Sequence, residues 1–260
     1  MAEKLYLGTN TKMYKTIAQT LEFLTRLDAR TKDIDRSKLE LFVIPSFTTL
    51  ESARKSVPKE SIRLGAQNMG WEEQGEYTGE ISPLMLKEVG VEIVEIGHSE
   101  RRHKLGETDE QENKKVLCAL EHGFTALLCI GETAAQKSYD LGPETLRTQL
   151  KIGLHGVKPE QASKLMVAYE PVWAIGVGGQ PASAEYAARM HRVIRDTLVE
   201  LLGEAGKSVP SLYGGSVNPQ NANELIVLPE VDGLFIGRSA WDAENFDRII
   251  RQVLPLYFAK

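Results

Sequence analysis

The chain has 260 residues, of which 42% are hydrophobic and 26% charged, so it can bury a large core and is neither disordered nor fibrous. With 31 Lys and Arg against 36 Asp and Glu, its formal charge is −5, and the absence of a basic run makes nucleic acid an unexpected partner. An anionic small molecule would need a local positive field from a lysine or from backbone amides. The length fits two small domains or one large α/β barrel.

The sequence also predicts a cytoplasmic protein without a metal or another cofactor. Residues 1–7 are too few and too charged for a signal peptide, and no apolar run approaches the length of a membrane span. Cys118 and Cys129 lie in apolar surroundings, so we expect reduced thiols that pack as small hydrophobic groups. No histidine pair or cysteine pair has metal-ligand spacing, the histidines being His98, His103, His122, His155 and His191.

Short apolar runs alternate with amphipathic stretches along the chain, which is typical of repeated βα units. The runs predict eight buried strands at Leu5–Gly8, Leu41–Ile44, Ile62–Ala66, Ile93–Ile96, Thr125–Ile130, Leu165–Tyr169, Ser211–Gly214 and Gly233–Ile236. The intervening stretches predict helices at Ile17–Arg30, Glu110–His122, Pro143–Leu154, Ala184–Leu202 and Phe246–Leu254. Asp109 is the expected N-cap of the second helix.

Eight strands with intervening helices predict a closed (β/α)8 TIM barrel. No Pro/Ser-rich linker or shift in composition divides the chain, so residues 1–260 are expected to form one domain. The main alternative is an open doubly wound sheet, which usually has fewer strands.

Polar residues follow several of the predicted strands, at the end where barrel enzymes build their active sites. Glu170 follows an apolar strand, and a desolvated carboxylate there suits a general base. Lys12 can stabilise negative charge on a substrate, and His98 at a helix start suits a neutral hydrogen-bond donor. Together they favour proton abstraction next to a carbonyl through an enediolate. Gly214-Gly215 and Gly237 leave backbone amides free for a phosphate.

Each of these residues also has a purely structural interpretation. Lys12 alone would be a solvated charge, His98 a helix cap, and Glu170 one half of an ion pair. Trp173 is expected to pack its own loop, and Glu100-Arg101-Arg102 to form an ion-pair network that orients a loop. The joint placement of Lys12, His98 and Glu170 at one barrel mouth favours the functional interpretation.

The residues quoted so far belong to longer motifs, and with these the sequence resembles the triosephosphate isomerase family over essentially its whole length. The matching stretches are Gly8-Thr9-Asn10, Lys12-Met13, Tyr77-Thr78-Gly79-Glu80, Ile96-Gly97-His98-Ser99-Glu100-Arg101-Arg102, Cys129-Ile130-Gly131-Glu132, Ala168-Tyr169-Glu170-Pro171-Val172-Trp173-Ala174-Ile175-Gly176 and Tyr213-Gly214-Gly215-Ser216-Val217-Asn218. This enzyme is a standard example of a Glu base, a neutral His and a closing loop.

The resemblance implies roles for individual residues of this chain. Glu170 would shuttle the proton between adjacent carbons, His98 would polarise the two substrate oxygens, Lys12 would supply the cation, and Asn10 would hydrogen-bond the same oxygens. The implied supporting residues for His98 and Lys12 are Ser99 and Glu100. The implied phosphate-binding residues, acting through backbone amides, are Gly176, Ser216, Gly215 and Gly237.

The resemblance further implies a lid and a partner subunit. Residues 171–181 would be the mobile lid that excludes water from the enediolate. The loop at Tyr77–Glu80 would enter the neighbouring subunit, with Thr78 near its active site, so a homodimer is implied.

Four departures from the family pattern concern the substrate more than the reaction. Thr11 replaces a common aromatic residue, and Tyr14 replaces a small polar one. The end of the lid reads Val177-Gly178-Gly179-Gln180-Pro181, which changes hinge freedom. The phosphate loop carries Arg238, followed by Ser239-Ala240-Trp241, and we favour a guanidinium that points away from the ligand.

The first expectation for the reaction is the interconversion of dihydroxyacetone phosphate and D-glyceraldehyde 3-phosphate, as in glycolysis and gluconeogenesis. The alternative is an L-erythrulose 1-phosphate isomerase of sugar-alcohol catabolism, because altered lid and phosphate loops would fit the same chemistry to one more carbon. A non-catalytic phosphosugar-binding protein on the same scaffold is a remote third, which the retention of Glu170, His98 and Lys12 disfavours.

Overall fold

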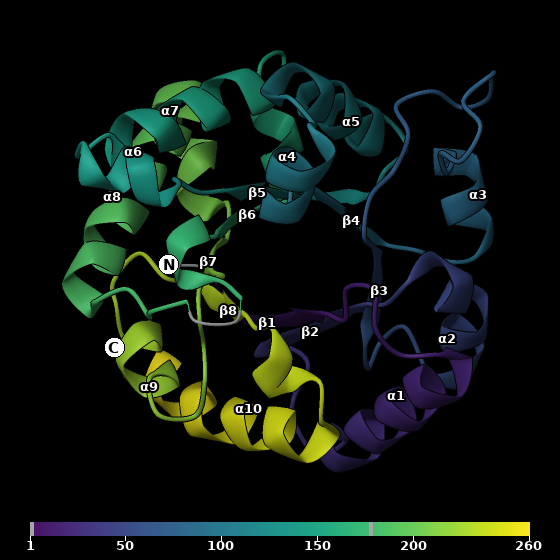
Figure 1. Cartoon of the computed structure of the whole chain (residues 1–260). Coiled ribbons are helices and arrows are strands. Elements are labelled where there is room, and N and C mark those ends of the chain that lie inside the picture. Colours follow the sequence, from purple (N-terminus) through teal and green to yellow (C-terminus); the bar gives the residue numbers. More distant parts are fainter. Residues whose placement is uncertain (1–2, 177–178) are drawn as a thin grey trace.

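The computed structural model describes residues 3–176 and 179–260. Eight parallel strands pair in chain order and close into a barrel, which confirms the predicted (β/α)8 fold (Figure 1). The strands are β1 (Leu5–Asn10), β2 (Leu39–Ile44), β3 (Arg63–Ala66), β4 (Ile93–Ile96), β5 (Thr125–Ile130), β6 (Leu165–Tyr169), β7 (Ser211–Tyr213) and β8 (Gly233–Phe235).

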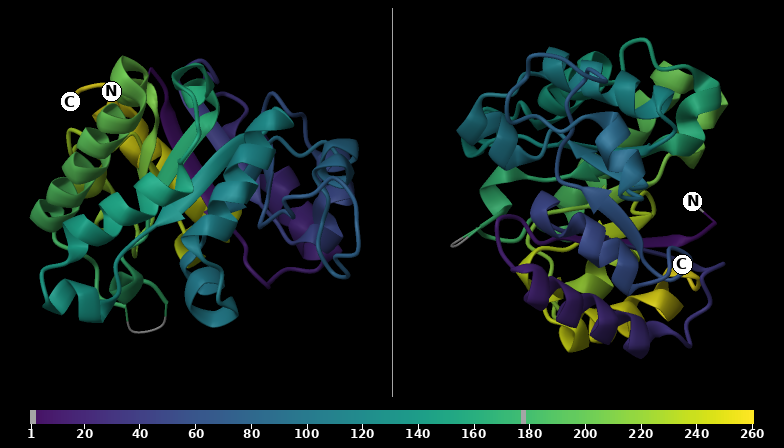
Figure 2. Two further views of the ribbon diagram at one scale, coloured as in Figure 1. Left: turned by 90° about the horizontal axis from the view of Figure 1, so that it is seen from above. Right: turned by 90° about the vertical axis from the view of Figure 1, so that its right-hand side faces the viewer.

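The helices surround the strands on the outside of the barrel (Figure 2). The α-helices are α1 (Ile17–Thr31), α2 (Leu50–Ser56), α3 (Pro83–Glu88), α4 (Ser99–Leu105), α5 (Asp109–Glu121), α6 (Ala134–Ser138), α7 (Gly142–Gly153), α8 (Ala184–Leu202), α9 (Ala222–Ile226) and α10 (Ala243–Tyr257). Short 3-10 turns are η1 (Phe47–Thr49), η2 (Pro159–Lys164), η3 (Val172–Ala174), η4 (Gly203–Ser208) and η5 (Arg238–Ala240). None of these helices in the described part of the chain is long and apolar enough to cross a membrane.

The first strand is longer than its apolar run predicts. It runs to Asn10, two residues beyond the predicted end at Gly8, because its partner β2 continues in register until Asn10 lies opposite Ile44. A local hydrophobic pattern does not show how far two neighbouring strands pair. Asn10 therefore stands on a strand end rather than in a loop, and Lys12 follows two residues later.

The predicted N-cap of α5 is wrong by one residue. Thr108 is the N-cap, since its hydroxyl accepts from the backbone N–H of Gln111 while the Gln111 side chain accepts from the Thr108 N–H. This reciprocal arrangement satisfies two backbone donors that a helix start leaves open. Asp109 instead lies in the first turn, where its negative charge interacts favourably with the positive end of the helix dipole.

The core has two layers separated by the strand backbones. The larger layer lies between strands and helices. The smaller fills the barrel interior with Phe42, Ile44, Ile93, Leu127, Cys129, Met166, Ala168, Leu212 and Phe235. The rings of Phe42 and Phe235 stack with centroids 5.8 Å apart, so this part of the interior is packed rather than open.

Both cysteines are free and buried, as predicted. Burial, together with smaller contributions from neighbouring carboxylates, raises the pKa of the Cys118 thiol to about 11, so the thiol stays protonated. Cys118 therefore packs as a small hydrophobic group of α5.

Candidate active site

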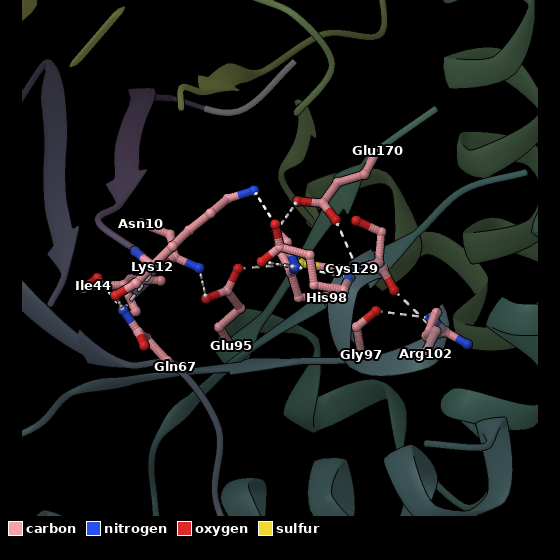
Figure 3. Close-up of polar contacts among 12 residues, drawn as sticks. Asn10, Lys12, Ile44, Gln67, Glu95, Gly97, His98, Arg102, Cys129 and Glu170 are labelled. Carbon is pink, nitrogen blue, oxygen red and sulfur yellow. Dashed lines mark hydrogen bonds and ion pairs between the residues drawn. The ribbon is translucent and has the colours of Figure 1, made fainter. Parts of the chain in front are cut away.

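The carboxyl ends of β4 and β6 bring His98 and Glu170 together (Figure 3). His98 Nε2 lies 3.4 Å from Glu170 Oε1, and both side chains are almost completely enclosed. The other oxygen of Glu170 accepts a hydrogen bond from the Ser99 backbone N–H at 3.2 Å. Strand pairing continues past β6, because the Glu170 N–H donates to the Ile130 carbonyl at 2.7 Å. The carboxylate is thus held at a defined place on the rim.

The imidazole of His98 is oriented by the turn that starts α4. His98 is the N-cap, and its Nδ1 accepts from the Glu100 backbone N–H at 3.1 Å. A ring nitrogen that accepts carries no proton, so in the neutral ring the proton sits on Nε2. That N–H points toward Glu170 and toward any substrate placed beside it.

Lys12 combines a strained backbone with a charged side chain. Its φ of 53° lies in the left-handed region, which typically costs about 1–3 kcal/mol for a residue with a side chain. Three hydrogen bonds hold this conformation: the Lys12 N–H donates to Asn10 Oδ1 at 2.6 Å, and its carbonyl accepts from Gln67 and Ser46 at 2.8 and 3.0 Å. The ammonium pairs with Glu100 at 2.8 Å. Strain of this kind is a common feature of functional sites.

The predicted ion-pair network of Glu100-Arg101-Arg102 has two different parts. Arg102 donates to the Gly97 and Cys129 carbonyls at 2.7 and 3.1 Å, so it fixes the turn that carries His98. Arg101 pairs with Glu107 at 2.7 Å. These two arginines have the predicted orienting role, whereas Glu100 holds the Lys12 ammonium.

The loop after β6 is anchored by a buried carboxylate that the sequence motifs did not single out for this task. Glu132 accepts from the Tyr169 hydroxyl at 3.1 Å, from Trp173 Nε1 at 2.7 Å and from the Tyr186 hydroxyl at 3.0 Å. Trp173 also lies under the Lys137 ammonium, 3.3 Å from its ring centroid. Trp173 thus packs its own loop, as expected, and also binds Glu132 and Lys137 there.

Close backbone approach explains one glycine of the β7 motif. A Cβ on Gly214 would lie 3.0 Å from the Glu170 side chain, tighter than ordinary contacts. The Gly214 N–H also donates to the Tyr169 carbonyl at 2.7 Å, which joins the β6 and β7 ends. A larger residue here would displace Glu170.

The predicted phosphate residues lie on neighbouring strand ends. Gly215 and Ser216 follow β7, and Gly237 follows β8, the next strand of the barrel. Asn221 donates to the Ser216 carbonyl at 2.8 Å, which fixes this turn. The side chain of Arg238 is exposed, and its expected direction relative to the ligand stays a prediction.

The predicted lid is described only in part. Gly176 is exposed and lies two residues beyond η3. Of the altered lid end, Gly179, Gln180 and Pro181 are among the described residues, whereas Val177 and Gly178 lie outside them. The expected change in hinge freedom stays a prediction.

Two residues of the site escaped the sequence analysis. Gln67, directly after β3, donates to Asn10 Oδ1 at 3.0 Å as well as to the Lys12 carbonyl. Glu95 stands inside β4 and accepts from Asn10 Nδ2 at 2.6 Å. A charged residue within the apolar run Ile93-Val94-Glu95-Ile96 was the available signal, because lone carboxylates are costly to bury.

Glu95, His98 and Glu170 also form the one group of potential metal ligands found among residues 3–176 and 179–260. One ligand atom from each lies within 4.8 Å of the others. Carboxylate and imidazole groups are donor types found at metal sites, but protein N–H groups already donate to two of the three, from Asn10 to Glu95 and from Ser99 to Glu170. The spacing along the chain did not reveal this group, since its members come from two strand ends.

Comparisons with known proteins agree with this geometry. The family model for triosephosphate isomerase matches residues 5–253. A Rhizobium etli protein named L-erythrulose-1-phosphate isomerase is 48% identical over 96% of this chain and 92% of its own length. A triosephosphate isomerase of Thermoanaerobacter pseudethanolicus is 43% identical, covering 93% of this chain and 96% of that protein. The crystal structure of triosephosphate isomerase from Bartonella henselae superposes with a TM-score of 0.86 at 32% identity, covering 99% and 100% of the two chains.

A closed (β/α)8 barrel with a carboxylate, an imidazole and an ammonium at its carboxyl-terminal mouth, together with these matches, defines a sugar-phosphate isomerase. The matches extend over nearly the whole chain and over the whole length of the solved structure. The chain belongs to the triosephosphate isomerase family. The resemblance stated from the sequence motifs is thereby confirmed.

Proposed function

We propose that this protein isomerises L-erythrulose 1-phosphate through an enediolate, which was the alternative expectation from the sequence. The Rhizobium etli relative with that name is more similar to this chain than the Thermoanaerobacter triosephosphate isomerase, at 48% against 43% identity. The altered residues around Arg238 and the lid end support a substrate that differs from a triose phosphate. Isomerisation of dihydroxyacetone phosphate is the second candidate, supported by the family model.

The observation that carries the proposal is the contact between Glu170 Oε1 and His98 Nε2 at 3.4 Å, with Lys12 on the same rim. We assign Glu170 as the base, because its carboxylate is enclosed and faces the imidazole. His98 donates from Nε2 to the substrate oxygens, with Asn10 as a second donor. Lys12 stabilises the negative charge of the enediolate.

The two candidate substrates share one reacting unit. In both, the phosphate-bearing carbon is bonded to a carbonyl carbon, which is bonded to a hydroxyl-bearing carbon. Glu170 removes the proton from that hydroxyl-bearing carbon and returns it to the former carbonyl carbon, while the hydroxyl proton moves between the two oxygens. From L-erythrulose 1-phosphate the product is the tetrulose phosphate whose carbonyl lies at C3. The tetrulose differs from the triose by a hydroxymethyl group on the reacting carbon.

We infer that the phosphate is bound by backbone amides of Gly176, Gly215, Ser216 and Gly237. Backbone amides in turns form concave anion sites, and phosphate sites after strands 7 and 8 are frequent in this fold. Such a site also explains how a chain of charge −5 can bind an anion.

A direct comparison of substrates tests the proposal. We expect kcat/KM for L-erythrulose 1-phosphate to exceed that for dihydroxyacetone phosphate by roughly tenfold or more, a difference of about 1.4 kcal/mol in transition-state binding. A higher value for dihydroxyacetone phosphate would overturn the tetrulose assignment and favour a role in glycolysis and gluconeogenesis. Binding without turnover of either compound would favour the phosphosugar-binding alternative.

We also propose a cytoplasmic homodimer in which Thr78 enters the partner's active site. The segment between β3 and α3 projects from the barrel (Figures 1 and 2), and Tyr77 and Thr78 on it are exposed. Met13, next to Lys12, is 95% exposed, which is unusual for a large apolar side chain beside a site. The two free thiols agree with a reducing compartment. Size-exclusion chromatography with light scattering at micromolar concentration checks the dimer, and a monomer mass would refute it.

A further inference from the structure

Glu95 is a buried carboxyl group that directly adjoins the reacting pair. It lies on β4 and is 0% exposed. One of its oxygens, one ring nitrogen of His98 and one oxygen of Glu170 all lie within 4.8 Å of one another. Glu95 therefore borders the space beside the reacting pair. Figure 3 shows Glu95 between Asn10 and Cys129, close to His98.

The two oxygens of Glu95 are used unequally. Oε2 accepts from Asn10 Nδ2 at 2.6 Å, a strong hydrogen bond. Oε1 has only the Cys129 thiol as its recorded partner in the described chain, at 3.8 Å, a long contact from a weak donor. This oxygen therefore retains hydrogen-bonding capacity that the protein does not satisfy, which is costly at a buried position.

The surroundings favour the protonated form of the Glu95 carboxyl. Burial raises its pKa well above the usual range, and the Glu170 carboxylate raises the pKa further. The hydrogen bond from Asn10 and the Lys12 ammonium act in the opposite direction, and Glu100 adds a smaller upward effect. A neutral carboxylic acid has an O–H to donate as well as an oxygen that accepts, which suits it to bind a hydroxyl group.

The barrel topology places Glu95 opposite the phosphate residues. In a ring of eight strands, β4 and β8 lie across the barrel from each other. A sugar phosphate anchored after β7 and β8 must extend toward β3 and β4 to bring its carbons between Glu170 and His98. The end of the substrate that is remote from the phosphate then approaches β4.

Substrate binding must also open the space above Glu95. His98 Nε2 and Glu170 Oε1 lie 3.4 Å apart. A carbon atom between them would need about this distance to each of the two atoms, so the present gap cannot hold one. The two side chains must therefore separate, and Glu170 must give up the hydrogen bond that it now accepts from the Ser99 N–H. Enclosure of Glu95 in this conformation is compatible with contact to a bound substrate.

We propose that Glu95 is a specificity-determining residue that recognises the terminal hydroxymethyl group of a four-carbon sugar phosphate. This inference rests on the proposed function. Glu95 Oε1 hydrogen-bonds the C4 hydroxyl while Oε2 keeps its bond to Asn10. A triose phosphate has no group to meet Glu95, so the unsatisfied oxygen stays unpaired and the triose is disfavoured. Sites built around a substrate hydroxyl discriminate strongly against analogues that lack it.

The test measures kcat/KM for both substrates in the wild type, Glu95→Leu and Glu95→Gln. Leu has a similar volume but cannot hydrogen-bond, so Glu95→Leu is expected to lower kcat/KM for L-erythrulose 1-phosphate by roughly 100-fold. The value for dihydroxyacetone phosphate should fall less, by the part of the loss that comes from Asn10, whose amide loses its acceptor in this variant. The readout is therefore the ratio of the two kcat/KM values, which should fall by roughly tenfold or more. Glu95→Gln keeps an acceptor for Asn10 and a donor for the substrate, so it should retain the tetrulose preference.

Cys129→Ala is the matched control, since it removes the neighbour on the other side of Glu95 while leaving the carboxyl and its Asn10 bond. It should change both substrates by the same factor. Equal losses for the two substrates in Glu95→Leu would overturn the inference and leave the proposed function standing. A wild type that prefers dihydroxyacetone phosphate would overturn the proposed function and this inference with it. If Glu95→Leu does not fold, the smaller Glu95→Val replaces it, with the same two readouts.

Discussion

The two halves of the barrel mouth are built by different means. Around β1, β3, β4 and β6, side chains hold one another: Asn10 with Glu95 at 2.6 Å, Lys12 with Glu100 at 2.8 Å, and His98 beside Glu170. After β7 and β8, glycines and backbone turns dominate, and the side chain of Arg238 is exposed. In the first half, interlocked side chains hold the groups proposed for proton transfer in place. In the second half, backbone groups line the barrel mouth.

The difference fits the groups that we propose each half binds. Proton transfer needs an acid, a base and a cation within a few tenths of an ångström of their working positions, which interlocked side chains provide. A phosphate group is a symmetric anion that many backbone N–H groups can bind, and glycines allow it to approach. Variants in the first half should therefore affect kcat, and variants in the second half should affect KM.

The largest effect is expected for Glu170→Gln. The amide keeps the size of the side chain but cannot take a proton, so kcat should fall by roughly three orders of magnitude or more. Thermal unfolding should be nearly unchanged, which separates lost chemistry from lost structure. Turnover close to the wild-type rate would remove Glu170 from the role of base.

A large effect is also expected for Lys12→Ala. Loss of a positioned charge at a developing oxyanion should lower kcat/KM by roughly 100- to 1000-fold. Lys15→Ala is a matched control, because Lys15 also has a positive φ, of 67°, but its ammonium lies over the Phe23 ring. Equal kinetic losses in the two variants would show that backbone strain or net charge matters rather than the Lys12 ammonium at the site.

A smaller effect of a different kind is expected for Gly237→Ala. A Cβ at this position meets nothing within 4 Å, so folding should be unaffected. The methyl group would stand where the phosphate approaches the backbone, and loss of one charge-assisted hydrogen bond should raise KM by roughly 10- to 100-fold. The inhibition constant of inorganic phosphate should rise in parallel. A raised KM with unchanged phosphate inhibition would place the phosphate elsewhere.

The smallest effect concerns how the free energy of unfolding depends on pH through His191, which packs against the ends of β6 and β7. The His191 ring packs against Tyr169 and Tyr213, at the ends of β6 and β7, with centroids 5.6 and 6.2 Å away. Burial, assisted by the Arg195 charge, lowers the pKa of His191 to about 3. Above the unfolded value of about 6.5 the ring is neutral in both states. As the pH falls below this value, only the unfolded chain binds the proton, and the native state loses about 1.4 kcal/mol per pH unit.

This loss can be isolated with His191→Gln, a neutral side chain that can keep the bond to the Ser211 hydroxyl. Between pH 7 and pH 5, the wild type should lose about 2 kcal/mol more unfolding free energy than the variant, measured by urea unfolding. Parallel curves for the two proteins would mean that His191 is not the group that titrates. The kinetic constants at pH 7 should change little, since the ring does not face the mouth.

The sequence predicted much of the fold and most of the interlocked half. The helix Ala184–Leu202 and the strands at 93–96, 125–130 and 165–169 have the predicted bounds, because their apolar patterns end at clear polar or glycine residues. Asn10 was expected as a loop residue and is instead the end of β1. That end depends on pairing with β2, which no local pattern records.

Glu95 shows most clearly where sequence reasoning stops. In the sequence it is a single charged residue within an apolar strand. Its role depends on whether its side chain points into the barrel or toward the helices. Closure of eight strands turns it inward beside Asn10, and the ends of β1, β4 and β6 then surround it. Gln67 was missed for a similar reason, since its partners are 57 and 55 residues away in the sequence.

The amino-acid sequence by itself determined the alternation of strands and helices and the presence of a base, an imidazole and a cation after apolar strands. These features are local, because hydrophobic periodicity and motif spacing are written over a few residues. The tertiary structure decided which side chains meet, as in the Lys12–Glu100 pair and the Asn10–Glu95 bond, and it raised the pKa of the buried Glu95 carboxyl. Those properties arise when distant strand ends are brought together out of water, where distance, burial and charge set each interaction.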